Sequence, residues 1–297
     1  MEDLIKIYKI DYDKDENKQI NGLIISHNSR IRCWLHGLKP EYFDNLLKIY
    51  STNNIRLKNC AILKLEINKK KVTLSLVYEG YVNKRKKGKY YTNNQNDFFN
   101  DVIFEPINLE LNIFGISELD IGNNHYNFYI MRHAEATHNS NKYLKQIDPE
   151  LTFKGFNNGG EQSTRAGYFL KEIFTNSSNN FFFISKLRRT KQTLSMILPE
   201  LDLDKKSFQI TVLPCTHEIK YYPGGKCEFR TKSTPSDTMI CKENELTNCS
   251  TNKNNSCCNL NQYPINWNYY LDFYKNNKQY SNINMIKLVF DFIKSNL

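Results

Sequence analysis

Arg132 and His133 stand together directly after a hydrophobic run, residues 126–131. That run consists mostly of aromatic and branched residues and contains no Gly or Pro, so it predicts a buried strand. An imidazole can attack phosphorus, and a neighbouring guanidinium can hold phosphoryl oxygens through paired hydrogen bonds. Ligands of open α/β sheets bind at the carboxyl ends of the strands. The pair therefore indicates a phosphate site at the end of this strand.

A second apolar run, residues 181–184, ends at Ser185 and leads into a predicted helix, residues 189–198, which Pro199 would close. Arg189 lies in the first turn of this helix. A side chain there points back toward the edge of the sheet, so Arg189 would bring a second guanidinium to the same place.

Three segments, in this order, resemble motifs of the histidine phosphatase superfamily, the phosphoglycerate mutase-like proteins. Residues 132–139 read Arg-His-Ala-Glu-Ala-Thr-His-Asn, residues 151–155 read Leu-Thr-Phe-Lys-Gly, and residues 185–193 read Ser-Lys-Leu-Arg-Arg-Thr-Lys-Gln-Thr. One such match is weak, whereas three in the family order are specific. The resemblance implies an α/β fold, a three-layer α/β/α sandwich with a mainly parallel sheet.

The family has a second active-site histidine near its C-terminus, and none follows the predicted last helix, residues 283–297. Near the other end of the chain, an apolar strand runs into His27, with Arg32 five residues later and two strand-like segments, 57–65 and 72–78, behind it. This order resembles the family's closing part. We therefore interpret the chain as a circularly permuted, phosphoglycerate mutase-like protein.

Permutation is physically reasonable because the termini of compact domains are often close together at the surface. The alternative is that residues 20–80 form an unrelated small domain and that His27 matches by chance. The permuted interpretation divides the chain into an N-terminal appendage (1–19), the permuted C-terminal part of the core (20–82), a linker (83–124) and the N-terminal part of the core (125–297), with an insertion at 221–262.

The resemblance implies roles for individual residues. His133 would be the nucleophile, neutral at the attacking nitrogen, and would form a phosphohistidine. Arg132, Arg189, His27 and Asn139 would bind the phosphoryl oxygens, whose charge must be stabilised in the transition state. His27 is thus both a catalytic and a phosphate-binding candidate. The guanidiniums take the role that a metal ion has elsewhere, so we expect no metal ligands and no cofactor.

The leaving oxygen also needs a proton. In the family a carboxylic acid beyond the strand after the last motif supplies it, and residues 208–213 predict that strand here. Glu218 is the candidate acid and Glu228 the alternative. Glu135, in the first motif, is expected to support the site rather than react.

Four positions depart from the family pattern. Ala134 replaces the motif glycine, Asn28 the glycine after the second histidine, Lys186 a proline and Thr190 an alanine. None of these exchanges removes a reacting group, so the resemblance still implies activity.

The sequence therefore predicts a metal-independent phosphomonoester phosphatase, a histidine acid phosphatase-type hydrolase, acting on a phosphorylated small molecule or a phosphoprotein. One alternative is a phosphoglycerate mutase-type phosphotransferase, which returns the phosphoryl group to a sugar acid. The other is a non-catalytic module that binds a phospho-ligand or another protein. The non-phosphate part of the substrate cannot be predicted from these residues.

The composition of the chain indicates in which compartment it works and with which partners. The chain has 297 residues, 40% of them hydrophobic, and a net charge of +10, which would attract anionic substrates. It has no apolar run of about 18 residues and no signal-peptide pattern. Its eight cysteines are scattered, the usage of a reducing compartment. We expect a cytoplasmic protein with reduced thiols, without membrane or nucleic-acid partners, and leave its oligomeric state open.

Overall fold

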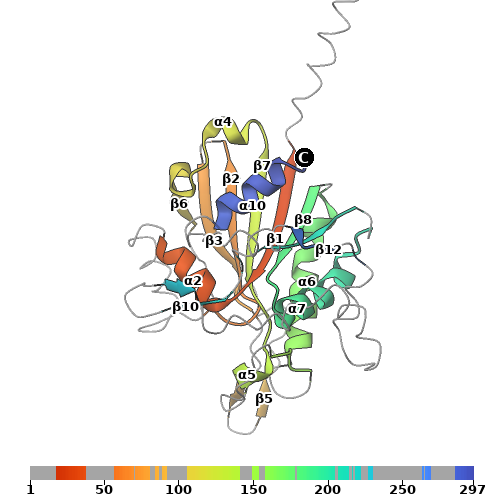
Figure 1. Ribbon diagram of the computed structural model, residues 1–297. Coiled ribbons are helices and arrows are strands. Elements are labelled where there is room, and N and C mark those ends of the chain that lie inside the picture. The colour runs from red at the N-terminus through yellow and green to blue at the C-terminus, as the bar shows by residue number, and fades with distance from the viewer. Residues whose placement is uncertain are drawn as a thin grey trace, which may run out of the picture.

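Figure 1 shows the computed structural model of the chain. The structure describes residues 18–37, 57–69, 71–80, 84–86, 89–91, 106–140, 149–153, 158–177, 179–204, 207–213, 216, 218–221, 227–229, 263, 265–268 and 285–297. Most of the predicted appendage and most of the predicted insertion lie outside these residues.

An eight-stranded mixed sheet forms the centre of the molecule, in the order β12-β9-β8-β1-β7-β2-β3-β6. The strands from β12 to β7 run parallel, and β2, β3 and β6 are added by antiparallel pairings. Their bounds are β1 Gln19–Ser26, β2 Ile62–Asn68, β3 Lys71–Tyr78, β6 Ile107–Leu109, β7 His125–Arg132, β8 Asn179–Ile184, β9 Ile210–Val212 and β12 Ile265–Asn266.

Helices cover both faces of the sheet, which gives the three-layer sandwich (Figure 1). Helices α6 (Gly159–Thr175) and α7 (Arg188–Leu201) pack on one face, and α2 (Asn28–Gly37) and α10 (Met285–Lys294) pack on the other. Buried strand residues alternate between the two cores, as the period of two in a strand requires.

Strand β1 lies between β7 and β8, although about 100 residues separate it from β7 in the chain. The register pairs Ser26 with Arg132 and Ile25 with Ile184. The strand that ends before His27 is therefore a direct neighbour of the strand that ends before His133.

Part of the predicted linker is ordered. Residues 107–121 contribute β6, the 3₁₀ helix η2 (Leu111–Phe114) and α4 (Glu118–Ile121). Leu109 and Phe114 are buried in the core that α10 covers, and β6 pairs with β3. The apolar residues of this stretch are buried against the sheet. The polar, lysine-rich segment before them led us to predict a linker over the whole range.

Helix α7 does not end before Pro199 but runs to Leu201 with the proline inside. Leu201 is fully buried against the sheet. Packing of this residue therefore carries the helix past a proline that lacks an N–H to donate.

The expectation of reduced cysteines is wrong for Cys33 in α2, which is disulfide-bonded. Cys60, by contrast, is a buried free thiol. Spacing along the chain does not show which cysteines the fold brings within bonding distance.

The remaining described elements are short. They are β4 (Lys84–Lys86), β5 (Lys89–Tyr91), α5 (Thr137–Ser140), β10 (Ile219–Tyr221) and β11 (Cys227–Phe229). None of the described helices is long and apolar enough to cross a membrane.

Candidate active site

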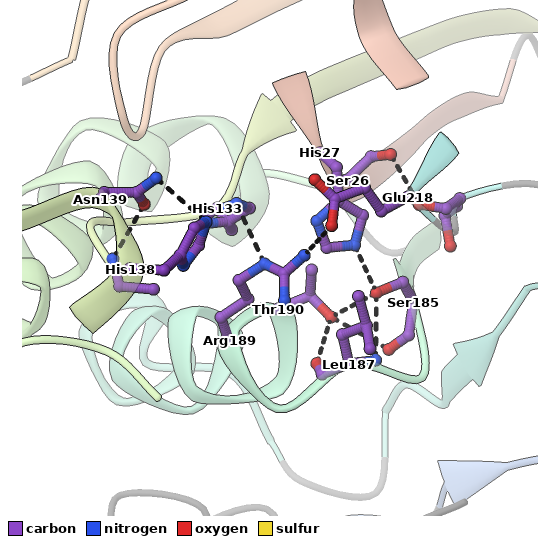
Figure 2. A network of polar contacts seen from close by, with 12 residues as sticks. Ser26, His27, His133, His138, Asn139, Ser185, Leu187, Arg189, Thr190 and Glu218 are labelled. Atoms are coloured by element: carbon purple, nitrogen blue, oxygen red, sulfur yellow. Dashed lines mark hydrogen bonds and ion pairs between the residues drawn. The ribbon is translucent and has the colours of Figure 1, made fainter. Parts of the chain in front are cut away.

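The carboxyl ends of β1, β7 and β8 meet at one edge of the sheet, where parallel strands present their following loops together. His27 follows β1, and His133 follows β7. The backbone N–H of His133 donates to the carbonyl of Ser26 (3.0 Å), which continues the pairing one residue beyond the strands. The ring centroids of the two histidines are 5.2 Å apart. Figure 2 shows both rings beside Arg189.

The hydrogen bonds of His133 define its tautomer. Its Nδ1 lies 2.6 Å from the carbonyl oxygen of Ala134, and the Nε of Arg189 donates to its Nε2 at 3.2 Å. A carbonyl only accepts and a guanidinium only donates. The ring hydrogen is therefore on Nδ1, and a lone pair remains on Nε2.

The surroundings also keep this imidazole neutral. His133 is only 3% exposed. Burial, together with the positive charges of Arg189 and Arg132, holds the pKa of His133 well below its usual value. A neutral imidazole with a lone pair on Nε2 is the form that can act as a nucleophile.

Arg189 joins the nucleophile to a carboxylate. Its Nη2 donates to Glu218 Oε2 at 2.6 Å while its Nε contacts His133. The Arg189 side chain is 2% exposed and that of Glu218 is 25% exposed. One buried guanidinium therefore connects the candidate nucleophile with the candidate acid, as the sticks in Figure 2 show.

The loop after β7 is held by side chains from the two helices behind it. The N–H of Ala134 donates to Thr193 Oγ1 (3.0 Å), and the N–H of Glu135 donates to Gln162 Oε1 (2.8 Å). From the segment before β2, Asn59 Nδ2 donates to the carbonyl of His133 (3.0 Å). Sequence reasoning assigned no role to these three polar residues, although Thr193 closes a matched motif.

Glu135 is turned into the protein. Its Oε1 accepts from the Thr152 hydroxyl at 3.0 Å, and its carbonyl accepts from the N–H of Thr152. A side chain at Gly159 would place its Cβ 2.1 Å from the carbonyl oxygen of Glu135, so only glycine fits there. Through these contacts Glu135 fixes the turn that follows His133.

Arg132 and Asn139, two candidate phosphate ligands, make different kinds of contact. An Nη1 hydrogen of Arg132 goes to the carbonyl of Leu57. The side chain of Asn139 accepts from the N–H of Ala136 (3.1 Å), and its Nδ2 lies 3.1 Å from His138 Nε2. Arg132 is close enough to influence the charge of His133, whereas the side chain of Asn139 makes hydrogen bonds within its own turn.

His27 is fully buried at the start of α2, and its Nε2 lies 2.8 Å from Ser185 Oγ. The next residue, Asn28, accepts a hydrogen bond from the N–H of Leu57 (3.0 Å). Asn28 therefore ties the start of α2 to the segment before β2. This is a contact that the family's glycine would lack.

Glu228, the alternative acid, has its backbone in β11 opposite Lys220 of β10. Among the residues that the structure describes, no group of three or more His, Cys, Asp or Glu side chains is arranged to hold a metal ion.

Comparison with known proteins identifies a family for part of the chain. The family model "Histidine phosphatase superfamily (branch 1)" matches residues 128–233. This range contains His133, Arg189 and Glu218 but not His27. No curated protein and no solved structure matches the chain.

Proposed function

We propose, from the match of residues 128–233 to the histidine phosphatase superfamily, that the chain is a metal-independent phosphomonoester phosphatase. It would act through a phosphohistidine on His133. The observation that carries the proposal is the buried contact between Arg189 Nε and His133 Nε2. It presents a neutral nucleophilic nitrogen and a phosphate-binding cation side by side.

In the first step, the phosphoryl oxygens draw the guanidinium of Arg189 away from His133 Nε2, with Arg132 and His27 as further donors. The freed lone pair attacks phosphorus in line with the leaving oxygen. The P–N bond forms, the P–O bond of the ester breaks, and the leaving alkoxide takes a proton from the carboxylic acid of Glu218. The Nδ1–H of His133, bound to the Ala134 carbonyl, stabilises the positive ring of the phosphohistidine.

In the second step, water attacks the phosphohistidine and gives a proton to the Glu218 carboxylate. The P–N bond breaks, inorganic phosphate leaves, and His133 returns to its neutral form with the hydrogen on Nδ1. Glu218 has then regained the proton that it donated. Arg189 Nη2 donates to Glu218 Oε2 in the structure, so a phosphate that takes this guanidinium would release Glu218, which could then hold the proton that it donates.

An assay with p-nitrophenyl phosphate from acidic to neutral pH tests the proposal. A phosphatase releases nitrophenol and inorganic phosphate in equal amounts. A mutase instead transfers the phosphoryl group to an added sugar acid and releases little phosphate. Binding of orthophosphate without turnover would support the non-catalytic module and overturn the hydrolase.

We further propose that residues 20–82 are the family's C-terminal part, displaced to the front by circular permutation. The position of β1 between β7 and β8 and the 5.2 Å between the two histidine rings support this. The test is a re-permuted chain that begins at residue 106 and joins Leu297 to Lys18 through a flexible linker. Folding with retained phosphatase activity supports the permutation. Failure to fold, with linkers of several lengths, argues against it.

A further inference from the structure

We propose that Thr190 and Ser185 act as positioning residues that keep a proton on Nε2 of His27. Thr190 stands where the family pattern has alanine, so the pattern lacks this hydroxyl and its hydrogen bonds. The inference rests on the proposed function of the same site, and extends it to two hydroxyls behind the second histidine.

Three groups meet at the hydroxyl of Ser185, which is fully buried. The N–H of Leu187 donates to Ser185 Oγ at 3.2 Å. His27 Nε2 lies 2.8 Å from the same oxygen, and Thr190 Oγ1 lies 3.0 Å from it. Figure 2 shows these contacts as a chain that ends on the imidazole. A hydroxyl has one hydrogen and accepts two, so three contacts saturate it.

Thr190 determines which atom is the donor in each of these hydrogen bonds. Its hydroxyl lies 2.9 Å from the carbonyl of Leu187 and 3.0 Å from that of Ser185. Carbonyls only accept, so the threonine hydrogen goes to one of them. The oxygen of Thr190 can then accept only from the hydroxyl of Ser185.

With its hydrogen given to Thr190, Ser185 must accept from both other groups. One is the N–H of Leu187, and the other is His27, which therefore carries a hydrogen on Nε2. This arrangement makes four hydrogen bonds. If Ser185 donated to His27 instead, only three hydrogen bonds would remain. Either the two hydroxyl oxygens, or the Thr190 oxygen and the two carbonyls, would then be in contact without a hydrogen between them. Such unsatisfied polar contacts cost free energy in a buried site.

The consequence concerns phosphate binding. With Nε2–H held by Ser185, a proton taken up on the other ring nitrogen makes His27 an imidazolium, the form that best stabilises phosphoryl oxygens. Without the Thr190 hydroxyl, Ser185 is free to donate to Nε2, which favours the neutral ring. The ring of His133 lies beside that of His27, and Arg189 on α7 links it to Glu218 before β10. The charge of Arg132 also acts on His133. These ionisable groups are unchanged between the variants compared below.

The experiment measures the protonation of the ring directly, by ¹⁵N NMR of histidine-labelled full-length protein. Protonated and unprotonated ring nitrogens resonate far apart, and His27→Gln assigns the signals among the six histidines. Thr190→Val removes the hydroxyl at nearly constant volume, and Thr190→Ser restores it. Thr175→Val is the matched control, because Thr175 also donates to backbone carbonyls but on α6, away from the site.

We expect Nε2 of His27 to be protonated in the wild type, Thr190→Ser and Thr175→Val, and to lose that signature in Thr190→Val. In activity assays the basic limb of kcat/KM should move to lower pH in Thr190→Val only, with kcat/KM lowered about three- to tenfold. An unchanged His27 spectrum in Thr190→Val overturns the inference. A changed spectrum in a protein with no phosphatase activity retains the inference and rejects the proposed function.

Discussion

Replacing Arg189 by methionine removes its charge and both hydrogen bonds while keeping most of its volume. In the structure this guanidinium contacts His133 Nε2 and Glu218 Oε2 from a buried position. Loss of one donor to a developing oxyanion costs about 10²–10³ in rate, so Arg189→Met should lower kcat by at least about that factor.

The same exchange should change the pH dependence. Burial is the larger cause of the lowered pKa of His133, and the positive charge of Arg189 is the next. Without that charge the pKa of His133 rises toward its ordinary value, and a larger fraction of the ring is protonated and unable to attack at acidic pH. The acid limb of kcat/KM should therefore move to higher pH.

Steady-state kinetics on p-nitrophenyl phosphate across pH measure both effects. The matched control is Arg188→Met, since Arg188 precedes Arg189 but is 43% exposed and pairs with Glu150 at 3.5 Å. Exposed pairs contribute about 0–1 kcal/mol, so this variant should resemble the wild type. Equal losses in the two variants, or an acid limb that stays in place in Arg189→Met, would refute the role assigned to Arg189.

Three further predictions concern the acid, the fold and stability. Glu218→Gln should lose much more activity on alkyl phosphates than on p-nitrophenyl phosphate, because a poor leaving group needs the proton more; equal losses on both would move the acid elsewhere. A fragment starting at residue 120 lacks β1, β2, β3 and β6 and should not fold, as judged by circular dichroism; a cooperative unfolding transition would contradict this. The pKa of His133 is lower in the folded protein than the ordinary histidine value of about 6.5, so the unfolded chain binds the proton first. The contribution of neutral His133 to the free energy of unfolding is therefore complete above about pH 6.5 and is lost as the pH falls below that value. Denaturant titrations of the wild type and of His133→Gln should show a smaller pH dependence of this free energy in the variant.

The parts of the site that follow strands could be predicted from sequence. An apolar run that stops at a polar residue marks a strand end, and parallel strands bring such ends to one edge. This logic placed His27 and His133 together. It also located Arg189, because a residue in the first turn of the following helix must lie at that edge.

Contacts between side chains of different elements could not be predicted in the same way. The pairing of Arg189 with Glu218, and the hydroxyl of Thr190 behind Ser185, depend on rotamers and on distances that no spacing encodes. Asn139 matched a motif, but its observed contacts are within its own turn. The disulfide of Cys33 likewise depends on which cysteines the fold brings together, and the positions of cysteines along the chain do not show that.

The central claim is a covalent phosphoryl group on His133. The most direct measurement is rapid quenching into alkali during turnover of a ³²P-labelled phosphomonoester, followed by peptide mapping. We expect acid-labile, base-stable label on the peptide that contains His133, formed at least as fast as turnover. The label should be absent from His133→Ala and retained in His125→Ala, because His125 lies at the opposite end of β7. Label that persists in His133→Ala, or turnover by the wild type without any labelled protein, would contradict it.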